Sequence, residues 1–347
     1  MQQVKLGVVG AGYWGPNLVR NALNHDDIEL TWVCDLEIER ASRLTRNLAD
    51  VRVTAEFSDL LNDVELDAIV IATPASTHGR LGIEVLKAGK HLLVEKPLAD
   101  NLDAGWEIVE FGETSGLVVM SDHTFCYTGA VQALRSLIRG GELGEIRFFD
   151  SVRINLGLVQ SDIDVFWDLA PHDLSILDFI LPDDVYPLSV SAIGSDPLGI
   201  DQASVGYFSL MLSNGAIAHC HLNWLSPTKV RTTIIGGSEK TVVWNDLDQS
   251  QKLSIYDTGV ELGALDRDDL ARALVSYRVG DMVAPVVDGT EALYNVMSEF
   301  ASAIRERRAP MTNGKSGLRV LEQIAAIQES MMRGGEPVEL TLARREP

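Results

Sequence analysis

The chain has few cysteines and no long apolar run. Its 347 residues include only three cysteines, Cys34, Cys126 and Cys220, and none of them forms a CxxC pair. Scattered thiols are typical of a reducing compartment, and they argue against a disulfide framework or a thiolate zinc site. No apolar run approaches the roughly 20 residues of a membrane-spanning helix, and the N-terminus enters a strand pattern without the features of a signal peptide. We therefore expect a cytoplasmic protein with no membrane partner.

Basic residues are scarce relative to acidic ones. The sequence has 29 Lys and Arg against 50 Asp and Glu, a formal net charge of −21, and the acidity is spread along the chain. A field of this sign repels phosphate backbones, so we expect no nucleic-acid partner. An anionic substrate would need a local cluster of basic side chains. The apolar content of 46% is ample for two buried cores in a chain of this length.

The first third of the chain alternates short apolar, β-branched runs with helical patterns. Strands separated by helices and apolar throughout are typical of a parallel sheet that is covered on both faces. The sequence therefore predicts a doubly wound Rossmann domain of the α/β class over residues 1–122. Strands are expected at residues 4–9, 28–35, 68–73, 91–94 and 117–120, and helices at residues 15–24, 37–49, 79–87 and 102–114.

The pattern changes after residue 122. Several strand-like runs between residues 188 and 256 are separated by turn residues such as Ser213-Asn214-Gly215 and Gly236-Gly237. This pattern predicts a second, α+β domain over residues 123–347, built on a large and mostly antiparallel sheet. Substrate binding and oligomerisation are assigned to this domain by the resemblance described below. A further strand is expected at residues 146–156, and helices at residues 130–139, 171–181, 291–305 and 318–332.

A glycine-rich turn follows the first predicted strand. Gly10, Gly12 and Gly15 form a GxGxxG pattern, with Tyr13 and Trp14 inside it, and the next residues open a helix. The first glycine permits a tight turn, the second lets a pyrophosphate approach the backbone, and the third lets the helix pack on the strand. The helix N-terminus adds N–H donors for the phosphates. The alternative is an ordinary strand–helix turn.

Asp35 makes dinucleotide binding the favoured interpretation of this turn. It ends the second predicted strand, twenty residues beyond Gly15. A carboxylate there accepts hydrogen bonds from the ribose hydroxyls of NAD and repels the 2′-phosphate of NADP. Asp35 is alternatively an N-cap of the following helix. We expect Arg40 and Arg43 to be surface residues rather than a phosphate clamp, so NAD is favoured over NADP.

Further segments occur in the order of a known family. Two end predicted strands, Ala72-Thr73-Pro74 with His78 shortly after, and Glu95-Lys96-Pro97. In a third, Trp167-Asp168-Leu169-Ala170-Pro171-His172, an aspartate precedes a histidine by four residues. With the glycine turn and the stretch from Thr312 to Val320, these segments resemble the Gfo/Idh/MocA family over nearly the whole chain. That family includes glucose–fructose oxidoreductase, inositol dehydrogenase and nucleotide-sugar dehydrogenases, which implies an NAD(P)-dependent oxidoreductase acting on CH–OH groups.

The resemblance implies that Thr73, Pro74, His78, Glu95 and Lys96 lie at the cofactor. The carboxyl ends of parallel strands are where a doubly wound sheet places its ligand. Lys96 is expected to hydrogen-bond the substrate oxygen and to stabilise the negative charge that develops as hydride leaves. A surface lysine in a turn is the alternative. Glu95 is expected mainly to shape the turn and to balance charge.

Asp168 and His172 complete the catalytic set that the resemblance implies. A histidine with an ordinary pKa of about 6.5 suits a general base near neutral pH. Asp168 precedes it by one helical turn, so in a helix the two side chains share a face and Asp168 orients His172. Alternatively Asp168 is an N-cap, because Pro171 prefers the first turn of a helix. A purely structural histidine is the alternative for His172.

The expected substrate is a sugar, polyol or nucleotide-sugar. The segments 168–172, Ser276-Tyr277-Arg278 and 314–320 resemble bacterial sequences that act on nucleotide-linked or amino sugars. A diphosphate group would need basic anchors, and the candidates are Arg153, Lys229 and Arg231. Exposed charge on a sheet face is the alternative, and it is slightly favoured.

Four other residues are weaker candidates for the site. By resemblance, His123 follows the last strand of the first domain and lies near the nicotinamide. Trp167 either stacks on a sugar or packs in the core. His219 and His221 occupy alternate positions of a predicted strand, but no carboxylate or cysteine completes a metal site, so no metal is expected.

Two other classes of function remain open. One is a dinucleotide sensor or inactive partner subunit that keeps the fold without turnover, although Lys96, Asp168 and His172 argue against it. The other is a non-redox enzyme with tightly bound NAD. By resemblance, the chain forms a homodimer or homotetramer.

Overall fold

The computed structural model describes residues 3–157, 159, 163–257, 259–262 and 275–342. The chain divides into two compact units, each assembled from segments that are distant in the sequence. Unit 1 comprises Met1–Thr128, Leu174–Phe179 and Gly289–Ala325, and unit 2 comprises Gly129–Asp173, Ile180–Asp288 and Ala326–Pro347. The sequence predicted a single boundary after residue 122. That division assigns Leu174–Phe179 and Gly289–Ala325 to the second domain, whereas in the structure they belong to unit 1.

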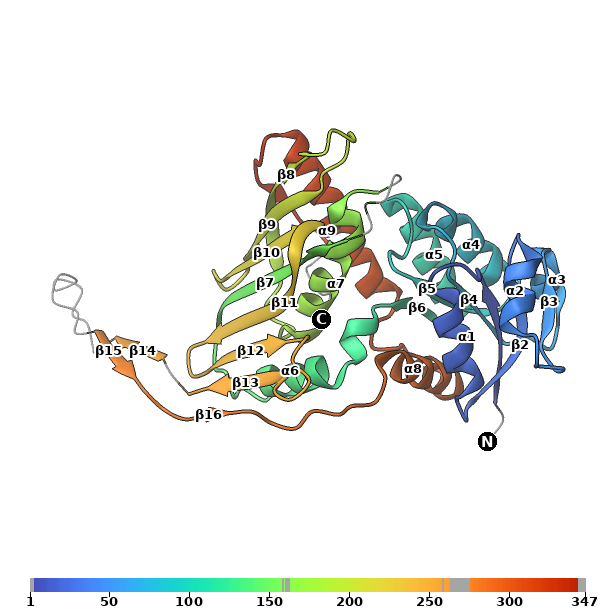
Figure 1. Cartoon of the computed structure of the whole chain (residues 1–347), viewed down its shortest axis with the longest axis horizontal. Coiled ribbons are helices and arrows are strands. Elements are labelled where there is room, and N and C mark those ends of the chain that lie inside the picture. The colour runs from blue at the N-terminus through green and yellow to red at the C-terminus, as the bar shows by residue number, and fades with distance from the viewer. Residues whose placement is uncertain (1–2, 158, 160–162, 258, 263–274, 343–347) are drawn as a thin grey trace. The chain divides into compact units, whose positions relative to one another are not determined.

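Unit 1 contains a parallel sheet of six strands in the order β3-β2-β1-β4-β5-β6 (Figure 1). All neighbouring strands run parallel. Every residue of β4 is buried, as expected for a strand that is covered on both faces. The doubly wound prediction is therefore confirmed, with β3 as an additional strand. The strands are β1 (Val4–Val9), β2 (Ile28–Cys34), β3 (Arg52–Thr54), β4 (Ala68–Ile71), β5 (His91–Glu95) and β6 (Val119–Asp122).

The helices of unit 1 begin and end largely where the sequence predicts. Asn101 caps α5 by accepting a hydrogen bond from the backbone N–H of Ala104 at 2.9 Å, and Gly116 ends the helix with φ 66°. Helix α2 is shorter than predicted and ends at Thr45, whose hydroxyl also donates to the carbonyl of Ala41. The helical segments are α1 (Gly15–Leu23), α2 (Ile38–Leu44), α3 (Phe57–Asn62), η1 (Ala75–Thr77), α4 (His78–Lys87), α5 (Leu102–Ser115), η2 (Thr124–Tyr127) and α8 (Ala292–Glu306).

Unit 2 is built on a sheet of nine strands, in the order β16-β13-β12-β11-β7-β10-β9-β8-β17. The strands pair antiparallel except for β7 and β10, so the predicted large, mostly antiparallel sheet is confirmed. The strands are β7 (Ile146–Leu156), β8 (Pro187–Ser195), β9 (Val205–Leu212), β10 (Ile217–Asn223), β11 (Leu225–Gly237), β12 (Thr241–Asn245), β13 (Leu253–Tyr256), β16 (Met282–Val283) and β17 (Val338–Glu339). A separate hairpin pairs β14 (Gly259–Leu262) with β15 (Val275–Arg278).

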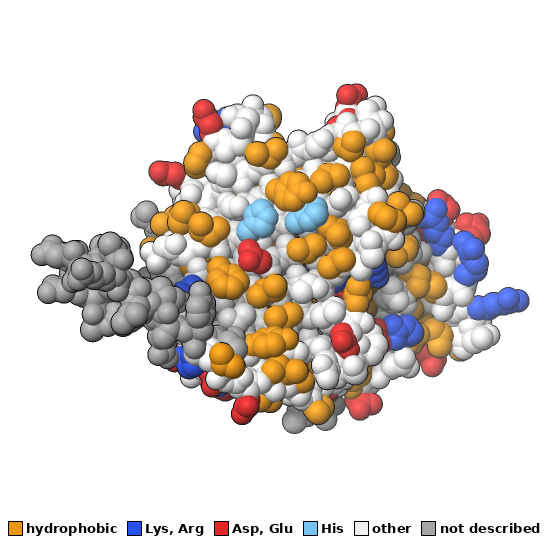
Figure 2. Space-filling model, turned by 60° about the vertical axis from the view of Figure 1, so that its left-hand side comes forward, with side chains coloured by type: hydrophobic (Ala, Val, Ile, Leu, Met, Phe, Trp, Pro, Cys, Tyr) orange, Lys and Arg blue, Asp and Glu red, His pale blue; other side chains and the backbone are white. Residues whose placement is uncertain are grey.

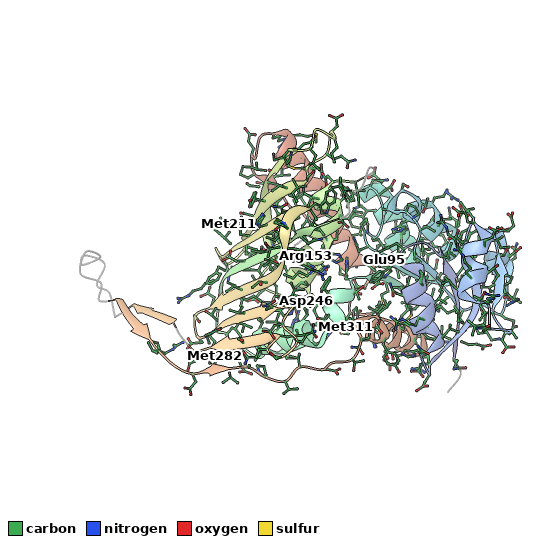
Figure 3. The ribbon with its side chains drawn as sticks, in the orientation of Figure 1. Glu95, Arg153, Met211, Asp246, Met282 and Met311 are labelled. Carbon is green, nitrogen blue, oxygen red and sulfur yellow. The ribbon has the colours of Figure 1, made fainter. Side chains whose placement is uncertain are left out.

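The two faces of this sheet differ. Side chains alternate between buried and exposed along β9 and β10, as in a sheet that is covered on one side only. Tyr207, Met211 and Ile217 project from the uncovered side with more than a third of their surface exposed. Figure 2 shows this side as a broad surface of apolar side chains with two histidines among them. Met211 is labelled on the same side in Figure 3.

Three helices remain: α6 (Gly129–Arg139), α7 (Val165–Ile180) and α9 (Gly314–Met332), of which α7 and α9 contribute to both units. The sequence predicts a helix from residue 171, but α7 begins six residues earlier. Asp164 Oδ1 accepts hydrogen bonds from the N–H groups of Phe166 and Trp167, both at 3.0 Å, and so caps the helix. Pro171 therefore lies inside α7 and not in its first turn.

Candidate active site

The glycine turn of unit 1 has a geometric reason for two of its three glycines, Gly10 and Gly15. Gly10 has φ 101°, and a Cβ atom there would lie 2.5 Å from the carbonyl oxygen of Ala72. A Cβ atom at Gly15 would lie 2.1 Å from the carbonyl oxygen of Gly10, so the start of α1 approaches the backbone after β1 too closely for any side chain. At Gly12 a Cβ atom would meet nothing within 4 Å. The open space at Gly12 and the N-terminus of α1 together suit a pyrophosphate.

Asp35 ties the end of β2 to this turn. Its Oδ2 accepts a hydrogen bond from the N–H of Ala11 at 2.6 Å, and its Oδ1 accepts one from the N–H of Glu37 at 2.8 Å. The N-cap of α2 is Glu37, so Asp35 is not the helix cap that the sequence left open. A carboxylate has about four lone-pair sites, so two remain for ribose hydroxyls. Tyr13 of the turn is largely exposed, at 88%.

The two arginines after Asp35 have partners on their own helix. Arg40 forms an ion pair with Glu37 at 2.6 Å, and Arg43 donates to the carbonyl of Glu39 at 3.2 Å. These contacts agree with the expected surface role. They agree with a preference for NAD, because neither guanidinium group is set aside for a 2′-phosphate.

His78 joins the turns that follow β4 and β5. Its Nδ1 lies 2.7 Å from the carbonyl oxygen of Pro97, and its Nε2 lies 2.8 Å from that of Thr73. Burial lowers the pKa of His78, although the two carbonyl contacts raise it. The ring is 1% exposed and both nitrogens are engaged, so His78 positions these turns and offers no nitrogen to a cofactor. The sequence predicted that His78 lies at the cofactor, but it did not predict that His78 acts only by positioning the neighbouring turns.

Thr73, Pro74 and Lys96 lie on the two turns that His78 joins. The hydroxyl of Thr73 lies 2.6 Å from that of Thr77, and Pro74 precedes η1. Lys96 follows β5 directly, and its peptide bond to Pro97 is cis. The three residues therefore stand at the carboxyl ends of β4 and β5, where a doubly wound sheet binds its ligand.

Glu95 and Asp122 face each other at the ends of β5 and β6. They are partners in the strand register, and the Thr124 hydroxyl donates to Asp122 Oδ1 at 2.8 Å. Burial raises the pKa of Asp122 to about 6. Burial and the charge of Asp122 raise the pKa of Glu95 well above its usual value, against the effect of Lys96. Asp122 was missed from the sequence because the strand was predicted to end two residues earlier, at Met120.

His123 is a buried imidazole at the start of the next loop. It is 2% exposed, and neither ring nitrogen has a hydrogen-bond partner among the residues that the structure describes. Burial lowers the pKa of His123 to about 4, Asp178 opposes this shift, and Lys96 and Arg319 reinforce it. The ring is therefore neutral at pH 7. Asp178 and Arg319, which sequence reasoning did not assign to the site, form a bidentate pair at 2.7 and 2.8 Å.

In unit 2, Asp168 and His172 lie inside α7. Because Asp164 caps this helix, the alternative that Asp168 is the N-cap does not hold. Their spacing of four residues places both on one face of the helix. The indole Nε1 of Trp224 donates to Asp168 Oδ2 at 3.0 Å, and Trp224 is 1% exposed. Asp168 is thus held by a buried donor that sequence reasoning missed, because Trp224 lies 56 residues away.

The basic candidates of unit 2 have protein partners. Arg153 is 4% exposed and binds Asp173 in a bidentate pair, with N···O distances of 3.0 and 2.9 Å. Ser151 also donates to Asp173 at 2.9 Å, so this cluster anchors α7 to β7. Figure 3 labels Arg153. Arg153 is therefore neither the exposed charge nor the accessible phosphate anchor that the sequence suggested. Arg231 forms an ion pair with Asp246 at 3.3 Å.

The other candidates remain on the surface or are partly covered. Lys229 is exposed and Trp167 is half-buried. On the uncovered sheet face, Tyr207 stacks on His221 with ring centroids 4.4 Å apart, and His219 Nδ1 lies 3.0 Å from the Ser209 hydroxyl. Among the described residues, no cluster of three or more His, Cys, Asp or Glu side chains has the geometry of a metal site. None of the described helices has the length and hydropathy needed to cross a membrane.

Comparison with protein families assigns both parts of the chain. A model for an oxidoreductase family with an NAD-binding Rossmann fold matches residues 4–123, and the Gfo/Idh/MocA C-terminal domain matches residues 131–243. The chain belongs to the Gfo/Idh/MocA oxidoreductase family. It is an NAD-binding oxidoreductase, so the predicted enzyme class and cofactor are confirmed.

Individual relatives align over almost the full length. UDP-N-acetylglucosamine 3-dehydrogenase of Acidithiobacillus ferrooxidans is 26% identical over 340 residues, covering 94% of this chain and 96% of that protein. Its solved structure has a TM-score of 0.79 at 24% identity, covering 96% of this chain and 99% of that chain. The uncharacterised oxidoreductase YrbE of Bacillus subtilis is 23% identical over 348 residues, covering 96% of each. Levoglucosan dehydrogenase, solved with NADH and levoglucosan, has a TM-score of 0.82 at 18% identity, covering 98% of this chain and 100% of that chain.

Proposed function

We propose that this oxidoreductase transfers a hydride between NAD and a hydroxyl or keto carbon of a sugar or nucleotide-sugar. The observation that carries the proposal is the placement of Asp168 and His172 on one face of α7, with the Asp168 carboxylate held by the buried indole of Trp224. A carboxylate fixed in this way orients a neighbouring imidazole as a general base. The substrate class is supported by relatives named for a nucleotide-sugar and for levoglucosan.

Each group has one task in the proposed reaction. The turn from Gly10 to Gly15 binds the pyrophosphate, and Asp35 accepts hydrogen bonds from the ribose. NAD, when bound, supplies the hydride acceptor. Lys96 donates a hydrogen bond to the substrate oxygen and stabilises the charge that develops on it. His172 accepts the hydroxyl proton, and Asp168 stabilises the imidazolium that results.

The uncovered sheet face supports a homodimer or homotetramer. Its exposed residues include Tyr207, Met211, Ile217, Ile193 and Phe148, a larger apolar set than scattered surface residues form (Figure 2). A second copy of the chain suits this face because isologous interfaces join the same patch on both subunits. The face of β7 and β10 also carries Asp150 opposite His219, which a second copy would bury as a complementary pair.

A cytoplasmic location is proposed on the state of the thiols. Cys34, Cys126 and Cys220 are all buried, and none of them forms a disulfide in the described part of the chain. Burial raises the pKa of Cys34 to about 11 and that of Cys220 well above its usual value, so both resist oxidation. Free thiols without disulfides are typical of a reducing compartment.

The proposal is tested by measuring NAD reduction against polyols, free sugars and nucleotide-sugars, including UDP-N-acetylglucosamine and levoglucosan. Turnover with a sugar or nucleotide-sugar, greater with NAD than with NADP, is expected. Binding of NAD without turnover of any substrate would favour a dinucleotide sensor. Product formation without net reduction of added NAD would favour a non-redox enzyme with tightly bound NAD.

A further inference from the structure

Two carboxyl groups meet in unit 1 at the ends of β5 and β6. Glu95 and Asp122 are direct partners in the parallel register, where neighbouring strands lie about 4.8 Å apart (Figure 3 labels Glu95). Asp122 is 1% exposed. Its Oδ1 accepts the Thr124 hydroxyl, whereas Oδ2 has no partner in the described part of the chain within normal hydrogen-bond geometry, although the nearby Trp14 indole lowers the pKa of Asp122. A proton on Glu95 supplies that missing donor, because the two side chains are within hydrogen-bonding reach.

The surroundings allow the pair one negative charge but not two. Like charges in one buried site oppose each other, so one carboxyl keeps its proton while the other ionises. Lys96 is the charged neighbour that lowers the pKa of both carboxyls, and His123, the titratable residue next to Asp122, is neutral above pH 4 or so. The pair therefore bears a charge of about −1 at neutral pH and becomes neutral as the pH falls through about 6.

The pair belongs to the half of the sheet that receives the nicotinamide. In a doubly wound sheet, each half binds one mononucleotide across the carboxyl ends of its strands. Asp35, directly after β2, marks the adenosine half, which leaves β4, β5 and β6 for the nicotinamide half. The nicotinamide ring is a cation when oxidised and neutral when reduced, so a fixed negative charge in this half distinguishes the two forms.

We propose that Glu95 and Asp122 share one proton and present a single negative charge that strengthens the binding of oxidised over reduced nicotinamide dinucleotide. The proposal rests on the assignment of NAD to unit 1. In acid, where both carboxyls are protonated, binding of NAD⁺ releases one proton from the pair to solvent, whereas binding of NADH releases none from it. The Kd for NAD⁺ should accordingly fall about five- to ten-fold between pH 5 and pH 7.5, and the Kd for NADH should change much less.

The test is calorimetric titration of the full chain with NAD⁺ and with NADH across this pH range. Repeating the titration at pH 5.5 in two buffers with different ionisation enthalpies counts the protons released. Asp122→Asn removes the ionising carboxyl with little change in shape, and Glu95→Gln removes the shared proton. Glu110→Gln, on the exposed side of α5, is the matched control for loss of one acidic charge.

The wild type and the control should release protons with NAD⁺ only, and Asp122→Asn should bind NAD⁺ with a Kd that is nearly independent of pH. If the Kd for NAD⁺ and the Kd for NADH changed with pH in the same way in the wild type, the proposal would be overturned, whatever the variants showed. Retained NADH binding shows that a variant has folded. A protein that binds neither nucleotide would overturn the cofactor assignment itself, whereas one that binds both without proton release would overturn the role of the pair alone.

Discussion

Replacing Trp224 by phenylalanine tests whether the indole fixes the Asp168 carboxylate for the proposed reaction. The substitution keeps an aromatic ring in a site that is 1% exposed, and it removes the donor that lies 3.0 Å from Asp168 Oδ2. Hydrogen bonds to charged groups contribute about 1.5–3 kcal/mol. If this energy serves to hold Asp168 in place for the imidazolium of His172, kcat should fall by a factor of roughly 10 to 100. The KM should change little, because the indole is buried away from solvent.

The assay is steady-state NAD reduction as a function of pH, together with thermal unfolding. We expect a change in the acidic limb of the plot of kcat against pH, because an Asp168 that is no longer held by the indole is less well placed to stabilise the imidazolium of His172. Trp32→Phe is the matched control, because Trp32 on β2 donates to Asp63 Oδ2 at 2.8 Å and has no assigned role in the reaction. Wild-type kcat and an unshifted profile in Trp224→Phe would refute the reasoning, even if the variant were less stable.

Three further substitutions separate cofactor binding, architecture and chemistry. Asp35→Ala should weaken NAD binding about ten-fold or more and weaken NADP binding less, measured by titration; equal losses would mean that Asp35 only supports the glycine turn. Arg153→Ala leaves Asp173 buried without its cation and should destabilise the protein by about 3–5 kcal/mol in urea unfolding, whereas a change under 1 kcal/mol would show that the pair is not a structural anchor. His172→Ala should lower kcat about 100-fold or more at unchanged NAD affinity.

Local patterns predicted the elements that form the candidate cofactor site. The glycine turn, the run of buried strands and the acidic residue at the end of β2 are all determined by residues close together in the sequence. The structure adds why two of the glycines are required, through backbone contacts of Gly10 with Ala72 and of Gly15 with Gly10. The alternation of apolar strands with helices is the kind of periodic pattern that a sequence predicts most reliably.

Residues that depend on distant partners were harder to predict. Arg153 has the same parity on β7 as the buried Phe149 and Ser151, which is a signal for burial, but its partner Asp173 is 20 residues away on a helix. Pro171 suggested a helix start, although Asp164 caps α7 instead. Asp122 escaped notice because strand ends are uncertain by two residues or so, and here two residues decide whether the carboxyl faces Glu95.

The central claim is that the enzyme moves a hydride from a sugar carbon to NAD. The most direct test is to oxidise a sugar or nucleotide-sugar substrate that carries deuterium on the reacting carbon, and to analyse the NADH formed by mass spectrometry. The account predicts one deuterium per NADH in the wild type, and strongly reduced formation of labelled NADH in His172→Ala. Product formed with unlabelled cofactor, or undiminished transfer in His172→Ala, would contradict it.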